Sequence, residues 1–127
     1  MKYADDSLAL HTDLYEIKMA YTYWKEDFSD RKAVFEVYYR ENPFGMGYTV
    51  FAGLERIVKY IEDLSFSQSD IDYLRNEHNF EEDFLDYLIN WKFRGTIRAM
   101  VEGELAFANE PLVQVEGPIL DCQIIET

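Results

Sequence analysis

The spacing of apolar side chains changes along this chain, and the change limits the folds open to it. Residues 14–24 repeat apolar side chains at helical spacing, and residues 54–64 do the same. Between them, residues 33–40 alternate: one face is apolar, and the other becomes polar toward Arg40. We therefore predict an α+β fold, with several helices and short strands in a mixed or antiparallel sheet.

The length and the cysteine content set further limits. A chain of 127 residues fits one domain with a core of ordinary size, and no repeat or linker divides it, so we expect residues 1–127 to form a single domain. The lone Cys122 excludes an intramolecular disulfide and fits a reducing compartment. Without a signal sequence or an apolar run of about 18 residues, we expect a soluble, cytoplasmic protein.

The chain is strongly acidic. Its 12 Lys and Arg residues and 25 Asp and Glu residues give a net charge of −13. This charge opposes phosphate backbones and anionic lipids, so we expect neither nucleic acid nor a membrane as a partner. Much of the acid lies between residues 62 and 86, in helix-like stretches without the glycine of a calcium loop. We interpret that region as a solvated helical face and predict no metal site.

Local signals place the other elements. Capping-box spacing predicts helices that begin near Asp13, Ser67 and Asn79, with Glu16, Asp70 and Glu82 three residues later. Glycine and proline in residues 42–47 predict a turn, and a hairpin-like pair of the strands that flank it. The predicted strands are 33–40, 48–52, 96–101, 105–108 and 112–116. The apolar-rich segment 118–127 predicts a last helix, which we expect to be truncated because it lacks a glycine cap and a basic last turn.

Standard catalytic motifs are absent from the sequence. There is no zinc-ligand spacing, no GxxxxGK[ST] loop and no GxGxxG after a strand. We interpret His11 and His78 as surface or turn residues, since neither has a nucleophile or an orienting carboxylate placed by the sequence. Gly45 and Gly47 could offer backbone N–H groups to a phosphate, but a turn explains them equally well, and we favour the turn. We predict no catalytic residue in this chain.

Six segments, taken together and in order, closely resemble the beginning of nicotinate phosphoribosyltransferases. They are TDLYEIKMAY (12–21), VFEVYYRENPFG (34–45), YTVFAGLE (48–55), FSQSDIDYL (66–74), FLDYL (84–88) and EGELAFANEPLVQVEGPILDCQIIET (102–127). The resemblance implies the fold of the N-terminal domain of a type II phosphoribosyltransferase. In that family an irregular α/β barrel follows, which residues 1–127 do not include.

The resemblance also implies an activity for the complete enzyme. The family is an ATP-dependent ligase and glycosyltransferase of NAD salvage, which joins nicotinate to 5-phosphoribosyl 1-pyrophosphate with ATP hydrolysis and Mg²⁺ and releases nicotinate mononucleotide and pyrophosphate. Its phosphorylated histidine belongs to the barrel, so neither His11 nor His78 takes that place. We expect this chain alone to bind no cofactor and to be inactive. The alternative is a free-standing, non-catalytic binding or regulatory subunit derived from this domain.

Three residues are candidate substrate contacts. Tyr15 falls on a helix stripe that is rotated away from the main apolar stripe, so from the residues alone it is either an ordinary interface aromatic or a ligand contact. By resemblance, Tyr15 stacks on the pyridine ring of the substrate in the partner subunit of a homodimer, and Arg40 reaches phosphate groups across the same dimer. Asp13 is expected to cap the turn that carries Tyr15 and to lie near the site.

Overall fold

The computed structural model of the protein describes residues 7–127. Within them the chain forms five α-helices, five strands and one 3-10 turn, which confirms the predicted α+β fold. The bounds, in chain order, are α1 (Leu14–Lys25), β1 (Lys32–Val37), η1 (Pro43–Gly45), β2 (Thr49–Val50), α2 (Leu54–Asp63), α3 (Gln68–His78), α4 (Glu82–Ile89), β3 (Thr96–Ala99), β4 (Leu105–Ala106), β5 (Val113–Pro118) and α5 (Ile119–Ile124).

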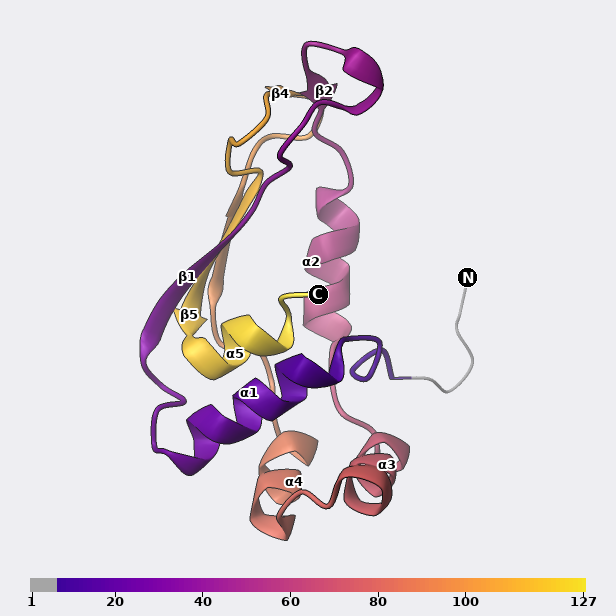
Figure 1. The fold of residues 1–127 in the computed structure, drawn as a ribbon, viewed down its shortest axis with the longest axis vertical. Helices are drawn as coiled ribbons and strands as arrows, with labels where there is room; N and C mark the ends of the chain where they lie inside the picture. Colours follow the sequence, from indigo (N-terminus) through magenta and orange to yellow (C-terminus); the bar gives the residue numbers. More distant parts are fainter. Residues whose placement is uncertain (1–6) are drawn as a thin grey trace.

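A three-stranded antiparallel sheet forms one side of the molecule (Figure 1), with β5 in the middle between β1 and β3. In the register, Val115 of β5 stands opposite Phe35 on one side and Ile97 on the other. The short strands β2 and β4 pair in a second antiparallel sheet, at the end of the molecule opposite to α3 and α4.

The predicted hairpin of the first two strands is wrong, because β1 pairs with β5 and β2 pairs with β4. Residues 38–48 separate β1 from β2, a connection much longer than the two to about five residues of a hairpin loop. The turn predicted at residues 42–47 is present: it contains η1, and the Met46 N–H donates to the Pro43 carbonyl at 3.2 Å. The partner of β1 therefore comes from the C-terminal part of the chain.

The strands β1 to β4 end earlier than predicted, whereas β5 runs to Pro118, beyond its predicted end at residue 116. The ladder of β1 shows why β1 ends early. β1 ends at Val37, whose partner Val113 begins β5. Just before β5 stands Pro111, which has no N–H to donate to a ladder. Arg40 therefore lies beyond the strand, in the connection to β2. The last helix, α5, also covers less than the predicted 118–127.

The core has two parts, and α5 belongs to both. Buried side chains of α1, α3, α4 and α5 make a helical cluster, which includes Ile17, Leu74, Phe84, Leu88, Leu120 and Ile124. Val113 and Val115 of β5 form a second, sheet cluster with Phe51, which follows β2, and with Cys122 of α5. Partly buried side chains of α2 pack against this cluster. Every side chain from Leu120 to Ile124 is buried, although the helix is only six residues long. This short helix joins the two clusters.

Of the three predicted capping boxes, only the one at the start of α3 forms. The Asp70 N–H donates to the Ser67 hydroxyl at 3.2 Å, and the Ser67 N–H donates to the Asp70 carboxylate at 2.7 Å. The Asp13 side chain does not cap α1, although Asp13 is its N-cap residue. Asn79 instead ends α3 in the left-handed conformation, with φ of 53°, so that α4 begins only after Glu81.

The start of α2 is capped from a distant part of the chain. Glu102, between β3 and β4, accepts hydrogen bonds from the N–H groups of Gly53 at 2.6 Å and Leu54 at 3.1 Å. Gly53 has a φ of 107°, a conformation that residues with a Cβ rarely adopt. A carboxylate at this position is favourable because the first N–H groups of a helix have no partner within it.

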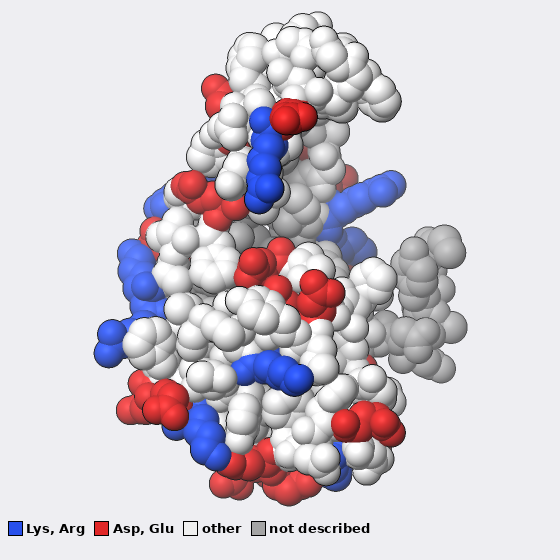
Figure 2. Space-filling view, viewed as in Figure 1, with Lys and Arg blue, Asp and Glu red and all other residues white. Residues whose placement is uncertain are grey.

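Charge is unevenly distributed over the surface. Figure 2 shows acidic side chains at the lower end, where Figure 1 places α3 and α4. The acidic residues of these helices are exposed apart from Asp70, as expected for a solvated face. In the view of Figure 2 the tip of the opposite end shows few charged side chains, and this end exposes Phe44, Met46, Tyr48, Val50 and Leu105. No helix within residues 7–127 is long and apolar enough to cross a membrane.

Candidate functional site

The first turn of α1 places Tyr15 on the surface. Its side chain is 58% exposed, whereas Ile17, two residues later and about 200° around the helix, is buried in the helical cluster. The prediction that Tyr15 points away from the core is therefore confirmed. An exposed aromatic ring on an otherwise well-packed helix offers a flat apolar face with a polar hydroxyl, which suits an aromatic ligand.

Asp13 lies directly before this turn and is exposed. Its backbone carbonyl accepts a hydrogen bond from the Glu16 N–H at 2.9 Å, but its side chain does not cap the helix. The hydroxyl of the neighbouring Thr12 is buried and has no hydrogen-bond partner among residues 7–127. The Asp13 side chain is thus exposed at the start of α1 without the capping role that we predicted for it.

Arg40 lies on a different element from Tyr15, in the connection between β1 and β2. Figure 1 shows the segment that follows β1 near the β2–β4 end, whereas α1 crosses the molecule beyond the other end of β1. The neighbouring Tyr39 is held in place, because its hydroxyl donates to the Ala106 carbonyl at 2.7 Å and its carbonyl accepts from the Asn109 N–H at 2.8 Å. Arg40 is exposed beside this anchor. Asp13 and Tyr15 thus lie at the start of α1, and Arg40 lies in the connection between β1 and β2.

A buried polar cluster behind Tyr15 was missed at the sequence level. Glu16, only 4% exposed, accepts a hydrogen bond from the Gln123 side-chain amide of α5 and another from the Thr127 hydroxyl at 3.3 Å. The same Gln123 amide also donates to Glu126, and its oxygen accepts from the Tyr23 hydroxyl at 3.3 Å. The only sequence signal was the position of Glu16 three residues after Asp13, which we assigned to a capping box.

Electrostatics in this cluster follow from its burial. Burial raises the pKa of Glu16; the Gln123 hydrogen bond opposes this shift, and the nearby charge of Glu126 adds to it. Burial also raises the pKa of the Tyr23 hydroxyl, with smaller contributions from Tyr15 and the two carboxylates. The folded protein thus favours the protonated forms of Glu16 and Tyr23 more than water does.

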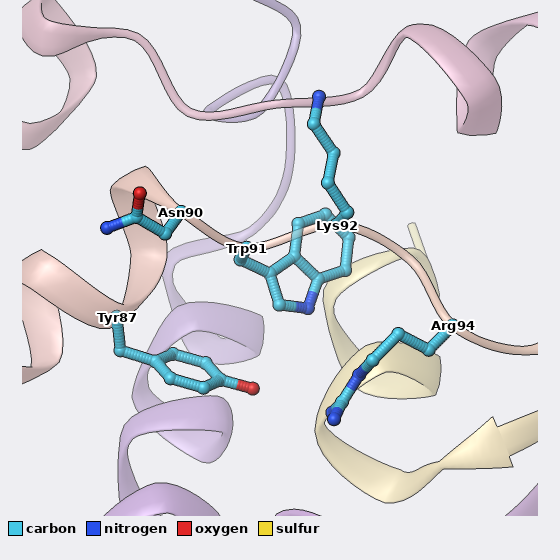
Figure 3. A pocket seen from close by; sticks show the side chains of 5 residues that line it. All are labelled: Tyr87, Asn90, Trp91, Lys92 and Arg94. Atoms are coloured by element: carbon cyan, nitrogen blue, oxygen red, sulfur yellow. The ribbon is translucent and has the colours of Figure 1, made fainter.

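Figure 3 shows a hollow of about 310 Å³ lined by Tyr87, Asn90, Trp91, Lys92 and Arg94. The Tyr87 ring and the Arg94 side chain point toward the same space. Arg94 is already engaged: its backbone N–H and its guanidinium donate to the fully buried Asp121 of α5 at 2.9–3.1 Å, and it pairs with Asp30 at 3.0 Å. The Trp91 indole N–H also donates to Asp121, at 3.1 Å. We interpret the hollow as the surface of a structural network.

The histidines have structural surroundings. The His78 ring packs edge-on against Tyr73, with 5.4 Å between ring centres, and His11 is exposed in the turn before α1. Among the described residues, no group of three or more His, Cys, Asp or Glu side chains is arranged to hold a metal ion. The geometry of residues 7–127 therefore offers an exposed aromatic side chain, Tyr15, as the candidate contact.

Comparison with known proteins gives a consistent result. Residues 10–127 match the family model described as the nicotinate phosphoribosyltransferase (NAPRTase) N-terminal domain. A nicotinate phosphoribosyltransferase of Bacillus subtilis is 50% identical over 125 residues, which are 98% of this chain and 26% of that protein. One of Caenorhabditis elegans is 45% identical, over 96% of this chain and 23% of that protein.

Solved structures show the same relationship. The crystal structure of human nicotinic acid phosphoribosyltransferase superimposes with a TM-score of 0.81 and 34% identity, over 91% of this chain and 24% of the human chain. A putative nicotinate phosphoribosyltransferase of Saccharomyces cerevisiae, 19% identical with a TM-score of 0.63, shares the fold. The chain spans about a quarter of the length of the relatives it matches. From its sequence and its fold, the chain belongs to the nicotinate phosphoribosyltransferase N-terminal domain family.

Proposed function

We propose that this chain serves as the N-terminal domain of an enzyme that joins nicotinate to 5-phosphoribosyl 1-pyrophosphate and forms nicotinate mononucleotide and pyrophosphate. The observation that carries the proposal is the family match over residues 10–127. The curated relatives named nicotinate phosphoribosyltransferase support the same substrates. We further propose that the complete enzyme uses ATP and Mg²⁺ and acts in the cytoplasm in NAD salvage.

The domain contributes to a site shared between subunits of a homodimer. Tyr15 supports this arrangement, because it is exposed and points away from its own core. The net charge of −13 supports it too, since phosphate-rich substrates need cations that an acidic domain does not gather by itself. In this arrangement Tyr15 stacks on the pyridine ring bound by the partner subunit, Asp13 lies beside that ring, and Arg40 reaches phosphate groups.

Arg40 and Tyr15 belong to separate contacts in this proposal. Tyr15 lies in the first turn of α1, whereas Arg40 lies in the connection between β1 and β2, so different elements carry the two contacts. Each residue therefore has its own signature: loss of Tyr15 weakens nicotinate binding, and loss of Arg40 weakens the binding of phosphorylated substrates.

The first test uses the isolated chain. Purified residues 1–127, incubated with nicotinate, 5-phosphoribosyl 1-pyrophosphate, ATP and Mg²⁺, should form no nicotinate mononucleotide, because we propose that the catalytic groups lie outside this domain. Chromatography of the reaction mixture measures the product. The full-length Bacillus subtilis relative is the positive control, and turnover by the isolated chain would contradict the proposal.

A further inference from the structure

Glu16 is a buried carboxylate directly beside the proposed substrate contact. Its side chain is 4% exposed, whereas that of Tyr15 is 58% exposed. A buried carboxylate reduces stability unless hydrogen bonds replace its lost water. Here the Gln123 amide and the Thr127 hydroxyl supply them, both from the last part of the chain. A polar contact at this position therefore connects the turn that carries Tyr15 with α5.

The Gln123 side chain is held at three points. One N–H donates to Glu16, the other donates to Glu126, and the oxygen accepts from the Tyr23 hydroxyl at 3.3 Å. These contacts use both donors of the amide, which is possible in one orientation of the group only. Gln123 thus contacts α1 at its first turn through Glu16 and two turns later through Tyr23.

The apolar part of the same interface sets which face of α1 is buried, but it constrains small rotations of the helix less than directional hydrogen bonds do. Ile17 and Ala20 of α1 pack in the helical cluster with Leu120 and Ile124 of α5. Contacts of this kind are non-directional, since their free energy depends on the buried area. Hydrogen bonds to Gln123 are directional, and they hold the first turn of α1 at one rotation relative to α5.

We propose that Glu16 is a positioning residue, which sets the direction in which Tyr15 leaves the domain by holding the first turn of α1 against Gln123. The proposal rests on the proposed function, in which Tyr15 contacts the pyridine ring of nicotinate. Glu16 itself does not touch the substrate. Its effect on the reaction therefore passes through Tyr15 and falls on nicotinate binding.

The test uses the full-length enzyme that contains this domain. Glu16→Ala should raise the KM for nicotinate about tenfold, while kcat and the KM for 5-phosphoribosyl 1-pyrophosphate stay within about twofold. Glu16→Gln keeps an oxygen that accepts from Gln123, so its KM should stay within about twofold of wild type. Gln123→Leu removes the same hydrogen bond from the α5 side and should raise the KM as Glu16→Ala does. This variant also covers the case in which Glu16→Ala fails to fold.

Asp70→Ala is the matched control. Asp70 is also a largely buried carboxylate, 9% exposed, and it accepts hydrogen bonds at the start of α3. Its loss should lower stability and leave the KM for nicotinate unchanged. An equal rise in KM in this variant would show that any loss of stability has the same effect, and it would overturn the positioning role.

A double variant separates this proposal from the proposed function. When Tyr15 is already Ala, Glu16→Ala should add no further rise in KM, and a further rise would overturn the proposal. If Tyr15→Ala raises the KM but Glu16→Ala does not, only the positioning role fails. If Tyr15→Ala leaves the KM unchanged, the substrate contact fails and the positioning role fails with it.

Discussion

At the scale of single residues, α1 has two neighbours with opposite environments, Tyr15 outside and Glu16 inside. Helical periodicity predicted the exposure of Tyr15, because its stripe is rotated away from the main apolar one. Periodicity did not predict the burial of Glu16. Its partner Gln123 is 107 residues away, and no local pattern reports a contact over that separation. Glu16 has the spacing of a capping box, but its carboxylate instead accepts a hydrogen bond from a residue far away in the sequence.

Tyr15 gives the first residue-level prediction. In the full-length enzyme, Tyr15→Ala should raise the KM for nicotinate because the ring that stacks on the substrate is lost. Stability should change by less than about 0.5 kcal/mol, since the side chain is largely exposed. Steady-state kinetics and thermal unfolding of the same preparations measure both effects. Unchanged kinetics would remove Tyr15 from the site.

Glu16 gives a second residue-level prediction, because its pKa is raised in the folded protein. The folded state holds the proton of Glu16 more tightly than the unfolded state does. The stabilisation is therefore complete below the unfolded pKa of about 4.5 and is lost as the pH rises through the higher, folded pKa. Compared with Glu16→Gln, the wild-type chain should lose free energy of unfolding as the pH rises above about 4.5.

Urea unfolding of both proteins across this pH range measures the difference. Lys25 and Arg75 lower the pKa values of Glu81 and Glu82, so these groups contribute with the opposite sign, and their stabilisation is lost as the pH falls. They are present in both proteins and cancel in the difference. A difference that is constant with pH would show that Glu16 has no raised pKa.

At the scale of elements, local sequence signals predicted a helix start correctly where the hydrogen-bonding partners lie within one turn of each other. The Ser67–Asp70 box begins α3 as predicted, because both partners lie within one turn. The Asn79 signal failed because Asn79 adopts a left-handed conformation and ends the preceding helix. Strand pairing failed more widely: the hairpin prediction assumed neighbours in sequence, and β1 and β2 both take distant partners. Pairing depends on which faces become buried together, and that is a property of the whole chain.

The capping box gives the element-level prediction. Ser67→Ala removes the hydroxyl that accepts from the Asp70 N–H, so it should lower the free energy of unfolding by about 1 kcal/mol. Asp13→Ala should cost only about 0.3–0.5 kcal/mol, because its side chain caps nothing and loses only a favourable charge at the start of α1. Denaturant titration of the two variants gives the comparison. Equal losses would mean that the two helix starts do not differ.

At the scale of the whole molecule, the helical and sheet clusters are joined through α5 and the segment before β3. Asp121 of α5 is fully buried and accepts from Trp91 and Arg94, and neither residue was singled out from the sequence. These contacts span about thirty residues of chain, and the participants share no periodic pattern. The sequence therefore predicted the exposure of Tyr15 but not the buried network around Asp121.

Asp121 gives the prediction at this scale. Asp121→Ala leaves the buried Trp91 indole N–H without an acceptor, which should cost about 1–3 kcal/mol of unfolding free energy. Asp30→Ala is the matched control, because it removes the exposed carboxylate on the same Arg94 and should cost less than about 1 kcal/mol. Thermal unfolding measures both variants. A larger loss of unfolding free energy from Asp30→Ala than from Asp121→Ala would contradict the structural role assigned to Asp121.

The position of β5 in the sheet has a consequence for protein synthesis. β1 leaves the ribosome early, but its ladder partner β5 follows much later: Glu36 and Gln114, which bond across the two strands, lie 78 residues apart. At a translation rate of about 5–20 residues per second, β1 waits roughly 4–16 s for its partner. During that time its apolar side chains and free backbone groups are exposed in the nascent chain. The three-stranded sheet of this domain is thus completed only when β5 has emerged.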